Sequence, residues 1–163
     1  MEIAMITHFN YWLIGTGWAE VYFSSASLNI KFEFSYISDP ISELFQGLKR
    51  LINNKSDLER IIFPEEPGEH SLVISRTEKD LIKVEIFRSD EWEAIGSAYN
   101  NDNEKEIVFS GTDTLKNFVF VVCTGIDNLL ERHTLTEYKE KWGSQFPLEH
   151  YEELKKGIRQ MPL

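Results

Sequence analysis

The chain has few of the residues on which a disulfide-bonded, secreted or membrane protein depends. Cys123 is the single cysteine among 163 residues, so no internal disulfide can form and a reducing compartment is expected. The longest strongly apolar run begins at Phe118 and is far shorter than the roughly 20 residues of a membrane-spanning helix. Residues 1–5 carry no basic group, which argues against a signal peptide. We therefore expect a cytoplasmic protein.

Catalytic and cofactor motifs are also missing. Gly15-Thr16-Gly17 is followed by Glu20 where a dinucleotide-binding loop needs glycine or alanine, so this segment is interpreted as a hairpin turn. There is no phosphate-binding loop and no nucleophile elbow, and the four histidines lack the spacing of metal ligands. Cys123 falls in the middle of a predicted helix, which is typical of a buried, inert thiol. The sequence predicts no catalytic residue, no metal and no cofactor.

Positive charge is scarce. The chain has 27 acidic and 17 basic residues, a net charge of −10, so neither nucleic acid nor an anionic membrane is expected as a partner. Residues 61–110 hold 12 acidic and 5 basic residues and contain most of the excess. This charge either keeps the domain soluble or attracts a basic protein partner. For the second hypothesis, the candidate binding residues are Glu65, Glu66, Glu69, Asp90, Glu91, Glu93, Asp102 and Glu104.

Large aromatic residues are concentrated near the N-terminus. Trp18 and Tyr22 share one face of a predicted strand with Glu20, and tryptophan and tyrosine are common anchors at protein interfaces. This face is therefore a candidate recognition surface, with Trp92 of the acidic segment as a further candidate anchor. The alternative is that a second layer, formed by the C-terminal helices, covers these rings.

Alternation of apolar and polar residues predicts a mostly antiparallel sheet of about six strands. The clearest strand is Leu28–Tyr36, in which Leu28, Phe32 and Tyr36 are expected on the core face. The other predicted strands are Ile6–Ile14, Trp18–Ser24, Ser71–Arg76, Leu81–Arg88 and Glu106–Ser110, and Leu58–Phe63 is a further candidate for a short strand.

Capping signals predict two long helices. Asp39 followed by Pro40 is typical of a helix start. Thr112 or Asp113 is expected to cap the second long helix, in which Gly125 costs about 1 kcal/mol relative to alanine. A glycine at that cost indicates close packing.

The C-terminal third is predicted to be helical throughout. A short helix, Thr136–Trp142, ends at Gly143, and Pro147 opens a last amphipathic helix. There is no linker, repeat or low-complexity segment. We predict one α+β domain over residues 1–163, with the helices packed mainly on one face of the sheet.

In size, acidity and strand-then-helix order the chain resembles small bacterial immunity-type proteins, which neutralise toxins. Ser35–Pro40 and Phe146–Glu149 look like the short connecting segments of such proteins. The resemblance implies an acidic surface that faces a basic toxin site and associates with it rapidly.

We therefore predict a non-enzymatic, acidic protein-binding module. One alternative is a small-ligand-binding domain or enzyme with an aromatic-lined pocket between sheet and helices. The other is a homodimer that buries a sheet edge or the aromatic face.

Overall fold

The computed structural model describes residues 5–90 and 105–162. This part of the chain forms seven strands and four helices, which confirms the α+β class and the helical C-terminal region. In chain order they are β1 (Ile6–Ile14), β2 (Trp18–Ser25), β3 (Asn29–Ser35), α1 (Pro40–Ile52), β4 (Leu58–Pro64), β5 (Glu69–Glu78), β6 (Leu81–Ser89), β7 (Glu106–Thr114), α2 (Leu115–Arg132), α3 (Leu135–Trp142) and α4 (Leu148–Gln160).

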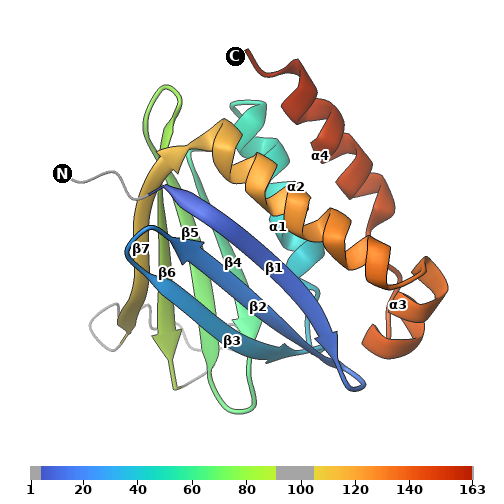
Figure 1. Ribbon diagram of the computed structural model, residues 1–163. Coiled ribbons are helices and arrows are strands. Elements are labelled where there is room, and N and C mark those ends of the chain that lie inside the picture. Colours follow the sequence, from blue (N-terminus) through green and yellow to red (C-terminus); the bar gives the residue numbers. More distant parts are fainter. Residues whose placement is uncertain (1–4, 91–104, 163) are drawn as a thin grey trace.

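The strands form two antiparallel sheets. Sheet A has the order β1-β2-β3 and sheet B the order β4-β5-β6-β7. Figure 1 shows sheet A lying across sheet B, with the four helices gathered on one side of the molecule. The sequence led us to expect about six strands in one sheet. Alternation identifies strands but does not report which of them share hydrogen bonds, so the division into two sheets could not be read from it.

The first hairpin forms because its turn residues accept unusual backbone angles. Gly15 and Gly17 have φ values of 61° and 79°, a region that glycine enters without a steric penalty. The turn sets the register between β1 and β2, in which Ile14 pairs with Trp18. This confirms the interpretation of the glycine pair as a hairpin turn.

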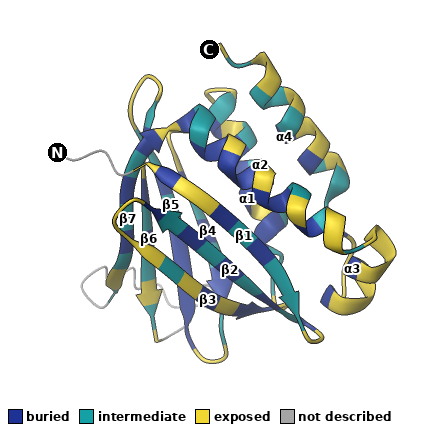
Figure 2. Ribbon diagram, in the orientation of Figure 1, coloured by how far each residue is buried: buried dark blue, intermediate teal, exposed yellow. Residues whose placement is uncertain are grey.

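The core lies between the two sheets and is rich in phenylalanine. The rings of Phe23 in β2 and Phe109 in β7 are 6.1 Å apart between centroids. Phe63 in β4 lies 5.3 Å from Phe32 and 5.0 Å from Phe34, both in β3. Because every second residue of β2 and β3 points inward, the opposite side chains form an outward face (Figure 2).

Two residues expected on the core face of the third strand are instead exposed. Leu28 and Tyr36 have exposed fractions of 44 % and 63 %, because the strand is shorter than predicted and both lie just beyond its ends. The amide of Tyr36 donates to Gly17 O at 3.1 Å, and its ring lies over Gly17, where no side chain intervenes.

Of the two predicted helix caps, the cap of α1 is confirmed and the cap of α2 is wrong. Asp39 caps α1, and its side chain accepts a hydrogen bond from the amide of Ser42. The cap of α2 is Thr114, so the prediction of Thr112 or Asp113 is wrong because β7 continues to Thr114.

Asp113 does not cap α2; its side chain instead forms hydrogen bonds to neighbouring elements. Its buried carboxylate accepts hydrogen bonds from Ile6 N at 3.2 Å and from Asn117 Nδ2 at 2.8 Å. Burial raises the pKa of Asp113, although the hydrogen bonds from Asn117, Thr114 and Ile6 oppose that effect. One side chain therefore joins β1, β7 and α2.

Helix α2 approaches β1 closely at Gly125. A Cβ atom at this position would lie 2.1 Å from the backbone oxygen of Phe9, which is well inside van der Waals contact. The close packing predicted from the sequence is confirmed. It places α2 directly against β1 (Figure 1).

Replacing Gly125 by alanine should destabilise the protein, despite the better helix propensity of alanine. The added methyl group meets backbone rather than a flexible side chain, so we expect a loss of about 3 kcal/mol in the free energy of unfolding, measured by urea denaturation. Gly157→Ala is the matched control. Its Cβ would lie 3.7 Å from Ile52, and it should gain up to about 1 kcal/mol. Equal stability of the two variants would contradict this packing.

Candidate functional site

Four of the predicted acidic residues lie at one end of sheet B. Glu65 and Glu66 belong to the β4–β5 turn, Glu69 begins β5, and Asp90 follows the end of β6. The turn packs on β6, because a Cβ atom on Gly68 would lie 2.7 Å from Ser89 O. The remaining candidates lie outside the described residues: Glu91, Trp92, Glu93, Asp102 and Glu104.

These four carboxylates do not form one acidic surface. Glu65 Oε1 lies 3.2 Å from His70 Nδ1, and Asp90 Oδ1 lies 3.2 Å from Arg88 Nη2. Glu69 is 1 % exposed, so it is not available to a partner, whereas Glu66 is exposed. The structure thus brings these acids to the same end of the sheet, but it buries Glu69 and places Glu65 and Asp90 beside bases.

The aromatic candidates Trp18 and Tyr22 are partly exposed. They lie on the outward face of β2, opposite to the buried Ala19, Val21 and Phe23. Helices α3 and α4 do not cover this face (Figure 2). We call it the outer face of sheet A and define it by Trp12, Trp18, Glu20, Tyr22, Lys31 and Glu33.

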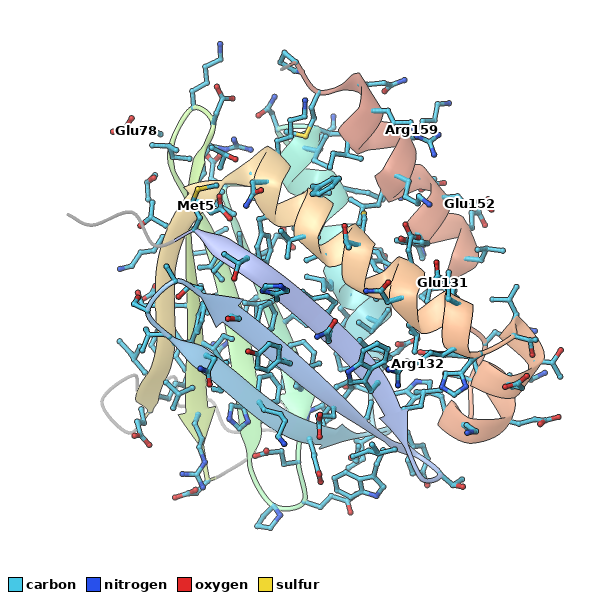
Figure 3. All side chains as sticks on the ribbon, viewed as in Figure 1. Met5, Glu78, Glu131, Arg132, Glu152 and Arg159 are labelled. Carbon is cyan, nitrogen blue, oxygen red and sulfur yellow. The ribbon has the colours of Figure 1, made fainter. Side chains whose placement is uncertain are left out.

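A cation anchors one side of the outer face. Arg132, at the end of α2, points to β1 (Figure 3), and its guanidinium carbon lies 3.9 Å from the centroid of the Trp12 ring. This contact is a cation–π interaction. This contact could not be predicted from the sequence, because the two residues are far apart along the chain and no local pattern links them.

Two acids lie side by side next to Trp12. The register pairs Trp12 with Glu20 and Glu20 with Glu33, so the three side chains form one row across β1, β2 and β3. No residue within 5–90 and 105–162 forms an ion pair with either carboxylate. Like charges directly opposite each other destabilise a sheet, so this end of the row favours an added cation.

The outer edge of β3 has unpaired backbone groups. Tyr36 N donates to Gly17 O and Ser25 N donates to Leu28 O, so the even-numbered residues of β3 bond to β2. The N–H and C=O groups of Lys31 and Glu33 therefore point to the opposite edge. No other strand in the described part of the chain pairs there.

A groove of about 570 Å³ runs beside this edge. One side consists of Ile30–Glu33 of β3, and the other side and floor come from sheet B. His70 lies in the groove, and its ring stacks on Phe32 at a centroid distance of 4.1 Å with 5° between the planes. The groove is completed by Glu65, Arg88 and Val108. Among these groove residues, Glu65 alone was predicted from the sequence as a binding residue.

A second cavity, of about 550 Å³, lies between the C-terminal ends of α1 and α4 and the β5–β6 turn. Arg76, Lys79 and Lys116 line it, but Arg76 donates to Leu51 O and Lys79 O. Lys116 likewise donates to the carbonyls of the C-terminal residues. Arg76 and Lys116 are thus engaged by backbone carbonyls, so we do not base an anion-binding site on this cavity.

The described residues give no support to thiol or metal chemistry. Burial raises the pKa of Cys123 to about 11, with a smaller contribution from Asp127, so the thiol stays protonated and unreactive near neutral pH. Within residues 5–90 and 105–162, no three His, Cys, Asp or Glu side chains are placed to hold a metal ion.

Comparison of the chain with protein-family models, curated protein sequences and solved structures gives no match. Across the described ranges, none of the helices combines the length and apolar character needed to cross a membrane. Inference about function therefore depends on the outer face of sheet A and the groove beside it.

The outward position of Tyr22 predicts that its removal is tolerated. Tyr22→Ala should lower the free energy of unfolding by about 1 kcal/mol, because the side chain fills no cavity in the core. Its neighbour Phe23 is fully buried, and Phe23→Ala should cost about 3–5 kcal/mol. Urea denaturation of both variants measures the difference. A loss at Tyr22 as large as that at Phe23 would mean that the outer face is covered.

Proposed function

We propose that the chain is a non-enzymatic protein-binding module that recognises a basic partner through the outer face of sheet A. The observation that carries the proposal is the row Trp12–Glu20–Glu33, in which neither of two adjacent carboxylates forms an ion pair within the described residues. A lysine or arginine from a partner would relieve the repulsion between them. In its narrower form, the partner is a toxin that the chain neutralises.

The side chains around this row have the composition of a protein-binding surface. Trp18 and Tyr22 are partly exposed beside Glu20, and such aromatic residues contribute most of the binding energy at many interfaces. They lie on a sheet whose other face is packed in the core, so they are held rigidly. Little conformational entropy is then lost on binding. The overall net charge of −10 adds a long-range attraction for a basic partner.

Capture of a partner should depend on salt. With the protein as bait in a native lysate, a basic partner should be retained at about 0.1 M salt and largely released at about 1 M, where the screening length falls from about 10 Å to about 3 Å. Quantitative mass spectrometry of the retained proteins measures this. Capture that does not change with salt, or that retains no basic protein, would overturn the proposal.

Two alanine variants of aromatic residues test which face of the protein captures the partner. Tyr22→Ala should weaken capture at least about tenfold, as expected when an anchor is truncated. Phe120→Ala is the matched control, because Phe120 is an aromatic residue with an exposed fraction of 61 % that lies on α2 and is not part of the outer face of sheet A. If the two variants bind equally, the outer face of sheet A is not the recognition surface.

A further inference from the structure

We propose that the partner binds by strand addition: an extended segment pairs with the free edge of β3 and makes sheet A four-stranded. The segment places apolar side chains in the groove and a lysine or arginine beside Glu33. This inference rests on the proposed function, since it names how the partner is held. Strand addition is a common way in which a sheet edge recognises a peptide.

The backbone of β3 supplies the hydrogen bonds. The N–H and C=O groups of Lys31 and Glu33 point away from β2, and four consecutive residues of β3, Ile30–Glu33, line the groove. Four residues of a strand extend roughly 13 Å at 3.3 Å per residue. The edge therefore matches a partner segment of about four to six residues.

The inner side of the groove favours apolar side chains. Ile30, Phe32 and Val108 line it, and Phe32 is held in place by the stacked ring of His70. Successive residues of an added strand point alternately inward and outward. Every second residue of the segment would thus contact this apolar surface.

The outer side selects for positive charge next to Glu33. Two bases of the groove are already engaged, because His70 lies 3.2 Å from Glu65 and Arg88 lies 3.2 Å from Asp90. On the outer face, Lys31 and Arg132 lie near Glu20 and Glu33, but among the described residues neither base forms an ion pair with these carboxylates. A cation on the added strand would extend the row Trp12–Glu20–Glu33 and lie directly opposite Glu33.

A single segment fits this edge better than a second copy of the chain. The lower end of sheet B, including the β4–β5 turn, projects past β3 (Figure 1), and its residues Glu65 and Arg88 form the far side of the groove. Pairing of β3 with β3 of another copy would place both sheets B on the same side of the joined sheet. The projecting end of each sheet B would then face the other copy, whereas a single added strand needs only the space between β3 and this end.

The probe is a set of six-residue peptides in which valine alternates with threonine and one threonine is replaced by lysine at each position in turn. At least one member should bind with a dissociation constant below about 1 mM, followed by the NMR shifts of the β3 amides. N-methylation of one alternating set of its backbone nitrogens should abolish binding, and methylation of the other set should leave it within about twofold. Failure of every peptide to bind, or equal effects of both methylation patterns, overturns the proposal.

Two protein variants test separately how the backbone hydrogen bonds of β3 and the charge of Glu33 contribute to peptide binding. Lys31→Pro removes a free-edge N–H and leaves the β2–β3 hydrogen bonds intact, so it should weaken peptide binding at least about tenfold relative to Lys31→Thr. Glu33→Lys should weaken it about tenfold relative to Glu78→Lys. Glu78 is exposed at the other end of sheet B, so this control makes the same change in net charge. Thermal unfolding confirms that each variant is folded; equal binding within either pair overturns strand addition.

The outcomes distinguish this inference from the proposed function. If the wild type captures a basic partner and Lys31→Pro captures it equally well, the binding function stands and strand addition is wrong. If peptides bind the β3 edge in the expected pattern but no basic partner is captured, the edge site stands and the proposed function is wrong.

Discussion

The packing of phenylalanine rings between the two sheets is the interaction on which the rest of the structure depends. Phe23, Phe32 and Phe34 of sheet A meet Phe63 and Phe109 of sheet B, so sheet A is fixed across sheet B by its inward residues. Alternation then leaves the outward residues of the same strands to form a second surface. The position of the groove follows as well, because β3 ends sheet A above a larger sheet.

The sequence could predict the elements better than their arrangement. Local signals were sufficient for the hairpin at Gly15 and Gly17 and for the Asp39 cap, since the chemistry of both lies within a few residues. The sequence signal at Gly125 also anticipated a close contact, although not that Phe9 would be the neighbour. The second sheet depends on packing between distant segments, and the exposure of Tyr36 depends on where β3 ends; periodicity encodes neither.

The residues of the candidate site, like the fold, could be predicted from the sequence only where the signal is local. The acidic segment was identified from composition, but whether charges converge depends on which face each side chain occupies and on nearby bases such as His70. The acid pair Glu20–Glu33 was missed because its members come from different strands, and pairing depends on register. Trp18 and Tyr22 were found because both lie on one alternating strand. Net charge therefore led to the proposed type of partner, while the register between strands supports the proposed place of binding.

Hydrogen exchange of the β3 amides in the protein alone tests the central claim, which is that this edge of sheet A is free. The amides of Lys31 and Glu33 should exchange rapidly, whereas those of Phe32 and Phe34, which donate to β2, should be protected by the ladder. NMR-detected exchange resolves the four residues individually. If Lys31 and Glu33 exchange as slowly as Phe32 and Phe34, the edge of β3 is already occupied. That result would contradict a free edge and, with it, the addition of a partner strand.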